Sequence, residues 1–338
     1  MRHGHVWTIL ILCSLMVLFL VTRHSGFESY ESKQRVSMET YPRAEMNAFM
    51  RAVFNRAVKT NTFVHERTHE TSMGTRLGRL DTLNSYAVLD TESDPTVTFT
   101  HTPGAYSSMF VYDQDNYVVG MVRHSGSYQF KRKTSPTRYL LVVCRFFVKD
   151  TGDFSRVYAY QDRCTIRPDG LELLDVEEFD PQSIQRIRAS IQPRIQVLRG
   201  QVGEHGYRGQ VSLDKRLLAS FIEQGGLPTS DMVQNAIQIP STYPKKLRLV
   251  PPPQTEDTGF WSVTVYDGTT YTVSPTQQQY VNSKTVRYHP MGSVELTFTN
   301  DTTDTDRNTL HVDKESVVVV FRTYRRTTPW KVPEFARV

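Results

Sequence analysis

The stretch Tyr139–Val148, YLLVVCRFFV, decides the fold class of this chain. Apart from Arg145 it contains only aromatic, β-branched, aliphatic and cysteine side chains, and it lacks the spacing of an amphipathic helix. Such a run predicts a central strand buried on both faces. Because strand side chains alternate, Cys144 shares a face with Val142 and Phe146 and is expected to be a buried thiol.

Similar strands occur on the N-terminal side of this run, at Thr96–Thr100, Ser107–Tyr112 and Tyr117–Val122. Turn-forming pairs separate them, at Asp94-Pro95, Pro103-Gly104, Ser125-Gly126 and Ser135-Pro136. Short strands at even spacing are typical of a β-sandwich and not of a parallel α/β sheet.

The pattern becomes helical after Asp180-Pro181, a pair that favours the start of a helix. Apolar residues from Ile184 to Val202 then recur at gaps of three or four, with a kink expected at Pro193. A second helix is expected at Leu213–Glu223, before Gly225-Gly226. Strands resume after Pro251-Pro252-Pro253, at Phe260–Tyr266, Val294–Phe298 and Ser316–Tyr324, and these predict a second β domain.

The N-terminus carries an uncharged run, Val6–Thr22, between Arg2 and Arg23. Its length is at the short end of what spans a bilayer, so residues 1–25 predict a single-pass membrane anchor in contact with lipid. The alternative is a cleaved signal peptide, although His24-Ser25-Gly26 is a poor cleavage site. Residues 26–60 are expected to form a stalk and an amphipathic helix at Pro42–Lys59. The flanking charges leave the side of the membrane open.

Composition limits the function classes. Hydrophobic content of 38% and charged content of 22% indicate a globular body. The net charge of +5 arises from 40 basic and 35 acidic residues spread along the chain, which does not favour specific nucleic-acid binding. Three cysteines cannot form a disulfide framework, and because Cys13 lies in the apolar run, only Cys144 and Cys164 could pair.

Collinear motifs resemble a bacterial two-module family of unassigned activity, domain-of-unknown-function families 1254 and 1214. The first module is carried by RLDTLNSYAVLD (Arg79–Asp90), YSSMFVYDQDNYV (Tyr106–Val118), TRYLLVVCRFFV (Thr137–Val148) and Tyr160-Gln161-Asp162; the second by GFWSVTVYDG (Gly259–Gly268), GSVELTF (Gly292–Phe298) and FRTYRRTTPWKVPEFARV (Phe321–Val338). The resemblance implies two jelly-roll-like β-sandwich domains joined by a helical connector, and it implies no reaction.

Several polar positions depart from the family pattern. Gly225-Gly226-Leu227-Pro228 is retained, but the histidine and tryptophan that precede it in relatives align with Arg216 and Gln224. The asparagine and tyrosine that flank the Asp-Thr-Leu motif of relatives appear as Leu80 and Asn84, and Asn308–His311 replaces an asparagine-cysteine-leucine-proline sequence. These changes argue against retained catalysis.

The string His65-Glu66-Arg67-Thr68-His69 spells H-E-x-x-H, which on a helix would place two imidazoles on one face for zinc. The surrounding sequence is polar, unlike the apolar helix of zinc proteases, so His65 and His69 are only a weak metal candidate. No cofactor is predicted.

The carboxylates Asp81, Asp113 and Asp115, with Asp90, are the weak catalytic candidates, because a cluster of acids suits acid/base chemistry or a hard cation. Asp113 and Asp115 also suit a turn between two strands. Asp81, Thr82 and Tyr112 are the predicted binding residues, in the motifs that carry the resemblance. Asn300-Asp301-Thr302 fits the glycosylation pattern.

The sequence therefore predicts a mainly β protein with an N-terminal anchor (1–25), a stalk and helix (26–60), a first β domain (61–179), a helical connector (180–250) and a second β domain (251–338). The expected function is that of a membrane-anchored structural or binding protein, as in a virion or envelope component, with protein partners or self-assembly. The alternative is a hydrolase-like enzyme with a site between the two β domains, so enzymatic activity is undecided.

Overall fold

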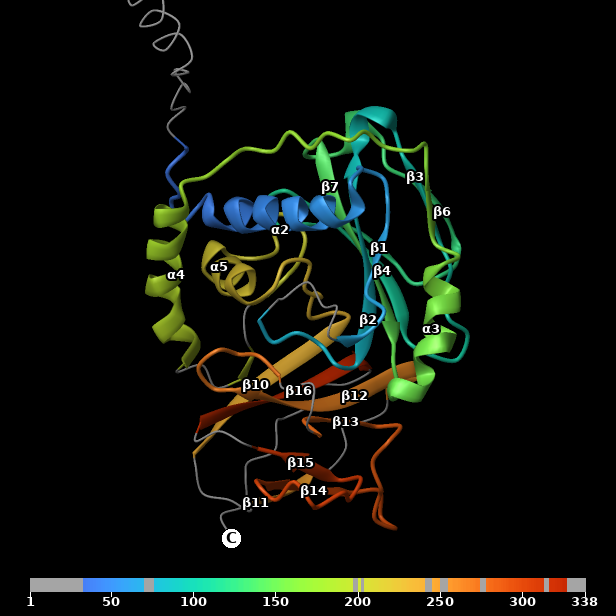
Figure 1. Cartoon of the computed structure of the whole chain (residues 1–338), viewed down its shortest axis with the longest axis vertical. Coiled ribbons are helices and arrows are strands. Elements are labelled where there is room, and N and C mark those ends of the chain that lie inside the picture. Colours follow the sequence, from blue (N-terminus) through green and yellow to red (C-terminus); the bar gives the residue numbers. More distant parts are fainter. Residues whose placement is uncertain are drawn as a thin grey trace, which may run out of the picture.

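The computed structural model describes residues 33–69, 76–196, 200–201, 204–240, 245–249, 255–273, 278–312 and 316–326. These residues form two β modules, one above the other, with three helices packed beside their junction (Figure 1). Within the described residues no helix is both long enough and apolar enough to cross a membrane. The predicted anchor, Val6–Thr22, lies outside them.

The first module consists of a five-stranded and a three-stranded sheet. The larger sheet has the order β1 (Val64–His65), β2 (Thr82–Asp90), β7 (Tyr139–Phe147), β4 (Ser107–Asp113) and β5 (Val118–Val122). The smaller sheet has the order β6 (Gly126–Gln129), β3 (Thr96–Phe99) and β8 (Thr165–Arg167). Short helical segments complete it at η2 (Thr91–Ser93), η3 (Arg132–Thr134), η4 (Thr151–Asp153) and α3 (Phe154–Gln161).

The strand β7 is buried along its whole length, which confirms the strand predicted from YLLVVCRFFV. It pairs in antiparallel fashion with β2 and β4. Cys144 and Phe146 point into the core between the two sheets, where they join Val97 and Ile166 of the smaller sheet. The opposite face of β7 packs against α2 and the second module, so neither face meets solvent.

The second module has the same division into five and three strands within the described residues. The larger sheet has the order β13 (Tyr280–Asn282), β12 (Thr255–Asp267), β16 (Ser316–Arg326), β10 (Met232–Pro240) and β9 (Gly200–Gln201); the smaller has β11 (Lys245–Leu249), β14 (Val294–Thr299) and β15 (Thr309–His311). Trp261 on β12 is 4% exposed and packs with Val263 and Phe321 between the sheets, as its strand pattern predicts. Trp330 lies outside the described residues.

Three longer helices fill the space beside the junction: α2 (Tyr41–Ala57), α4 (Pro181–Gln196) and α5 (Leu213–Ile222) (Figure 1). The helix α2 matches the prediction for Pro42–Lys59 except at its C-terminal end, where Val58 adopts a left-handed φ of 66° and ends it. One side of α2 packs on the first module and another on α4 and α5. The helices therefore pack against both modules, through the clusters that contain Phe49 of α2 and Phe221 of α5.

The predicted helical connector, residues 180–250, contains more than helices. It includes β10, which pairs with β16 over its full length from Met232 to Pro240, and β11, which pairs with β14. The predicted domain boundary at residue 251 would assign β10 and β11 to the connector and their partner strands, β16 and β14, to the second domain. The run MVQNAIQIP carries polar residues at Gln234, Asn235 and Gln238, and for this reason its strand character is weak in the sequence.

Candidate functional site

The motif residues of the two modules meet at Asp81, which is fully buried at the junction. The backbone carbonyl of Asp81 accepts a hydrogen bond from Val148 N (3.0 Å), which fixes Asp81 beside the end of β7. Its Oδ2 accepts from Ser262 Oγ (2.7 Å) on β12 and from Tyr324 OH (2.8 Å) on β16. Its Oδ1 has no hydrogen-bond partner. A carboxylate of the first module is thus held by hydroxyl groups of the second.

Arg322, two residues before Tyr324, is also fully buried. It donates to Tyr266 OH (2.8 Å), to the carbonyl oxygen of Leu77 (2.8 Å) and to Gln234 Oε1 (3.3 Å). Burial, together with the charge of Asp81, raises the pKa of Tyr324 well above its ordinary value. The Tyr324 hydroxyl therefore stays protonated and acts as a donor to Asp81.

A buried ion pair lies in the same region. Arg79 Nη2 donates to Glu223 Oε1 at 2.7 Å, and both side chains are nearly inaccessible to solvent. Burial opposes ionisation of Glu223, but the neighbouring Arg79 and His205 outweigh it and lower its pKa. Burial lowers the pKa of His205 to about 4. Arg145 on β7 donates to the carbonyl oxygen of Gly225, which ties the retained Gly-Gly turn to the first module.

We refer to this set as the inter-module polar core; its members are Arg79, Asp81, Glu223, Ser262, Arg322 and Tyr324. Sequence analysis identified Asp81 and missed the rest as site residues. The usable signal was that Ser262, Arg322 and Tyr324 lie in the same motifs that carry the resemblance. A single sequence gave no comparable signal for Glu223, because a lone glutamate at the end of a helix reads as a solvated residue.

A cleft with a volume of about 780 Å³ opens beside the polar core, along the seam between the modules. Its lining comes from both: Thr68, His69, Leu80, Lys149, Asp150, Thr151 and Phe154 from the first, and Gln278, Gln279, Tyr280, Val281, Lys284, Thr285, Thr305 and Arg307 from the second. Two hydrogen bonds cross the seam beside the cleft. Tyr280 OH donates to the Val148 carbonyl (3.2 Å), and Asn282 Nδ2 donates to the Lys149 carbonyl (2.8 Å).

The charge of the cleft lining is predominantly positive. Lys149, Lys284 and Arg307 are all exposed, and Asp150 is the only carboxylate among the lining residues. Lys149 comes from the first module and Lys284 and Arg307 come from the second, so both modules contribute cations to the cleft lining. An arrangement of this kind attracts anions, an attraction that salt weakens.

His69 lines the cleft from the first module. Its ring packs edge-on against Phe154, with ring centroids 5.3 Å apart, and its Nε2 is buried without a hydrogen-bond partner. Burial lowers the pKa of His69, although the nearby Asp81 charge works in the opposite direction. A neutral imidazole at pH 7 is available to donate a hydrogen bond to a ligand or to accept a proton from one.

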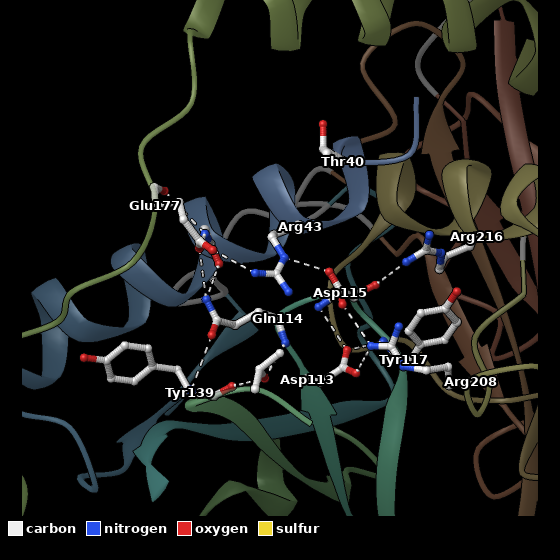
Figure 2. Close-up of polar contacts among 12 residues, drawn as sticks. Thr40, Arg43, Asp113, Gln114, Asp115, Tyr117, Tyr139, Glu177, Arg208 and Arg216 are labelled. Atoms are coloured by element: carbon white, nitrogen blue, oxygen red, sulfur yellow. Dashed lines mark hydrogen bonds and ion pairs between the residues drawn. The ribbon is translucent and has the colours of Figure 1, made fainter. Parts of the chain in front are cut away.

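The predicted acids Asp113 and Asp115 lie elsewhere, in the turn between β4 and β5 (Figure 2). Asp113 Oδ1 accepts from the backbone amides of Asp115 and Tyr117, both at 2.9 Å. Arg208 Nη2 bridges the two carboxylates, at 2.7 Å from Asp113 and 2.9 Å from Asp115, and Arg43 Nε donates to Asp115 at 2.7 Å. These acids hold a turn and fasten α2 and the connector to it.

The carboxylates do not form one cluster. Asp113 pairs with Leu140 at the start of β7, as Asp90 pairs with Tyr139, whereas Asp81 lies beside Val148 at its end. At 3.2–3.4 Å per residue, eight residues of strand separate the two ends by about 26 Å. The proposed grouping of Asp81 with Asp90, Asp113 and Asp115 is therefore wrong.

The remaining candidates are hydrogen-bonded to other groups of the protein. Thr82 Oγ1 donates to Asn84 Oδ1 at 3.3 Å, and Tyr112 OH donates to the Gly226 carbonyl at 2.8 Å. His65 is on strand β1, where Nδ1 contacts Ser85 Oγ at 2.7 Å.

The H-E-x-x-H segment is thus not helical, and its two imidazoles do not share a helix face. In the part of the chain that the structure describes, no group of three or more histidine, cysteine, aspartate or glutamate side chains is placed to hold a metal. Asn300 is exposed just after β14.

Comparisons with known proteins agree with this architecture. Residues 229–328 match the family described as "Protein of unknown function (DUF1214)". The crystal structure of the VPA0106 protein from Vibrio parahaemolyticus is similar in fold, with a TM-score of 0.64 and 14% identity over 89% of this chain and 98% of that one. An uncharacterised protein from Burkholderia cenocepacia gives a TM-score of 0.50 and 13% identity over 85% of each chain. No curated protein matches this chain.

Proposed function

We propose that this protein is a membrane-tethered binding protein whose two β modules hold a small anionic ligand in the cleft between them. The observation that carries the proposal is the cleft of about 780 Å³ whose lining includes Lys149, Lys284 and Arg307. Its volume lies within the range of small-molecule sites. Phosphate, sulfate or carboxylate groups are the ligand chemistry that lysine and arginine recognise.

Binding accounts for the site better than hydrolysis by a pair of acids. Asp81 uses Oδ2 to hold Ser262 and Tyr324, and Asp150 is the only acid in the cleft lining. Asp113 and Asp115 are committed to a turn at the far end of β7. A two-carboxylate mechanism needs both groups beside one scissile bond.

The proposed tether is residues 6–22, an uncharged run between Arg2 and Arg23. We further propose that the first module belongs to family 1254 and that both modules are jelly-roll-like. Eight strands are described in each module, five in one sheet and three in the other, which is the strand number of a jelly roll. A tethered protein of this build suits a virion or envelope surface, by analogy of fold alone.

A second candidate function is supported by His69. This residue lines the cleft, its Nε2 is buried without a hydrogen-bond partner, and the charge of Asp81 acts on the same ring. Asp81 Oδ1 is likewise unpartnered. A histidine beside a buried aspartate is an arrangement that activates water or a hydroxyl group, so a hydrolase-like reaction on the bound anion is the alternative.

The test is calorimetric titration of the protein with inorganic phosphate, citrate and a neutral disaccharide at low salt. We expect binding of at least one anion, no binding of the sugar, and at least a tenfold loss of affinity when Lys149, Lys284 and Arg307 are all changed to alanine. The control variant replaces Lys131, Lys133 and Lys246, which removes the same charge from outside the cleft and should retain affinity. Equal losses in both variants would reduce the effect to net charge and refute the site.

The hydrolase alternative has a separate measurement. Hydrolysis of p-nitrophenyl phosphate and p-nitrophenyl acetate is compared between the wild type and His69→Gln. Turnover that falls at least a hundredfold in His69→Gln, while anion affinity is retained, would favour the enzyme. Equal background rates in both proteins would leave binding as the function.

A further inference from the structure

The two cysteines of the first module come from opposite sheets of its sandwich. Cys144 is in the middle of β7 in the larger sheet, and Cys164 immediately precedes β8 in the smaller one. Their exposed fractions are 0% and 5%, and both belong to the same apolar cluster between the sheets. Because packed sheets are about 10 Å apart, side chains from facing strands meet in the middle.

Both thiols lie in the same layer of side chains between the sheets, and Cys164 Sγ donates a hydrogen bond to the Tyr160 carbonyl at 3.5 Å. Interaction with the side chain of Cys144 lowers the pKa of Cys164, whereas burial raises the pKa of Cys144. Cys164 is thus the thiol of the pair that more readily becomes the attacking thiolate.

We infer that Cys144 and Cys164 are a site of oxidative cross-linking, in which a low-molecular-weight disulfide such as oxidised glutathione converts the thiol pair to an inter-sheet disulfide. Inter-sheet disulfides are an established way to brace a β-sandwich. The inference is independent of the proposed ligand.

The reaction proceeds in two exchange steps. The Cys164 thiolate attacks one sulfur of the oxidant, forming a mixed disulfide and releasing one glutathione thiolate. Cys144 then loses its proton and attacks the Cys164 sulfur, which releases the second glutathione. Two electrons and two protons pass from the protein thiols to the oxidant, giving one disulfide and two molecules of reduced glutathione. Because Cys164 is 5% exposed, the first step requires local opening of the turn between α3 and β8.

The cross-link would close the chain from residue 144 to residue 164. That segment holds η4 and α3 and supplies one wall of the cleft, through Lys149, Asp150, Thr151 and Phe154. Closing a loop of about 20 residues reduces the freedom of the unfolded chain and stabilises the folded state. Oxidation would therefore fasten the cleft wall to the centre of the first module.

The experiment uses the full-length protein, reduced and then equilibrated with oxidised and reduced glutathione at several ratios. After an acid quench the protein is unfolded, alkylated with N-ethylmaleimide and digested with trypsin. We expect a cross-link between peptide Tyr139–Arg145 and peptide Cys164–Arg186, with Cys13 still alkylated or glutathionylated. The melting temperature of the oxidised protein should rise by several degrees.

Variants separate the cross-link from other oxidation. Cys13→Ser should still form the cross-link, and Cys144→Ser and Cys164→Ser should each lose both the cross-link and the rise in melting temperature. Alkylation of Cys144 and Cys164 at every ratio would overturn the inference. So would a glutathione adduct on Cys164 that never resolves to the cross-link, because Cys144 would then be out of reach.

Discussion

The substitution Asp81→Ala tests whether the two modules are coupled through the inter-module polar core. It removes the acceptor of two hydrogen bonds, from Ser262 Oγ and Tyr324 OH, at a position with 0% exposure. A hydrogen bond to a charged group contributes about 1.5–3 kcal/mol, and both hydroxyl groups would be left buried without this partner. The expected loss in the free energy of unfolding is therefore about 3–5 kcal/mol. Asp81→Asn keeps an acceptor oxygen and should lose about 1–2 kcal/mol.

The assay is urea denaturation of a chain that begins at Ser32, monitored by tryptophan fluorescence and circular dichroism. The matched control is Asp169→Ala, at an exposed aspartate of the first module, which should change stability by no more than about 0.5 kcal/mol. The double substitution with Ser262→Ala should show a coupling energy of about 1 kcal/mol or more. A loss below about 1 kcal/mol for Asp81→Ala would refute the reasoning, since the bonds would then contribute nothing to the junction.

Three further predictions follow from the same contacts and from the sequence. Trp261→Ala should destabilise the protein by about 3–5 kcal/mol because the ring is 4% exposed, and a loss below about 1 kcal/mol in the same assay would contradict this. Stability should fall as the pH drops from about 6.5 to about 4, by up to about 3 kcal/mol from His205, because its folded pKa of about 4 lies below the unfolded value near 6.5 and the unfolded state binds the extra proton. His205→Gln should reduce the slope of that part of the stability profile without abolishing it, because burial also lowers the pKa of His65 to about 4 and lowers the pKa of His69, and an unchanged slope would rule His205 out. Carbonate washing should leave the full-length protein in the membrane pellet while a chain that begins at Ser32 is soluble, and full-length protein in the supernatant would refute the anchor.

Strands that are rich in aromatic and β-branched residues were predictable from the sequence. Tyr139–Val148 and Phe260–Tyr266 are buried on both faces, so composition alone signals them. The strand β10 was not predictable in the same way, because Gln234, Asn235 and Gln238 interrupt its apolar residues without a regular alternation and because it follows two helices. Its identity depends on pairing with β16, more than 75 residues away along the chain, which local patterns do not record.

The isolated second domain, Pro251–Val338, illustrates the consequence. Without residues 232–240 the edge of β16 that pairs with β10 would be unpaired, and an exposed strand edge promotes aggregation. The effect of Trp261→Ala on stability is therefore measured in a chain that keeps residues 232–240.

The candidate site was only partly predictable because the roles of its residues depend on their burial in the folded protein. Arg79 and Glu223 are ordinary surface types in a sequence, yet here they form an ion pair with side chains 4% and 8% exposed. Asp113 and Asp115 are the opposite case, since two nearby acids suggest chemistry but fold into a turn held by Arg208 and Arg43. Spacing along the chain could not distinguish these roles, and only the strand register separates Asp81 from the other acids.

Because the cleft lies beside the inter-module polar core, binding of an anion in the cleft would affect the stability of the folded protein. The cleft lining includes Leu80, the neighbour of Asp81, and Tyr280, whose hydroxyl crosses the seam to the Val148 carbonyl. A ligand that bridges Lys149 of one module and Lys284 of the other would add a contact across the same seam that Asp81, Ser262 and Tyr324 already join. Because a ligand that binds only the folded state stabilises it by mass action, an anion in the cleft should raise the melting temperature of the whole body. In Asp81→Ala the junction between the modules would already be weakened. If the anion no longer raises the melting temperature of that variant, the shape of the cleft depends on the inter-module polar core.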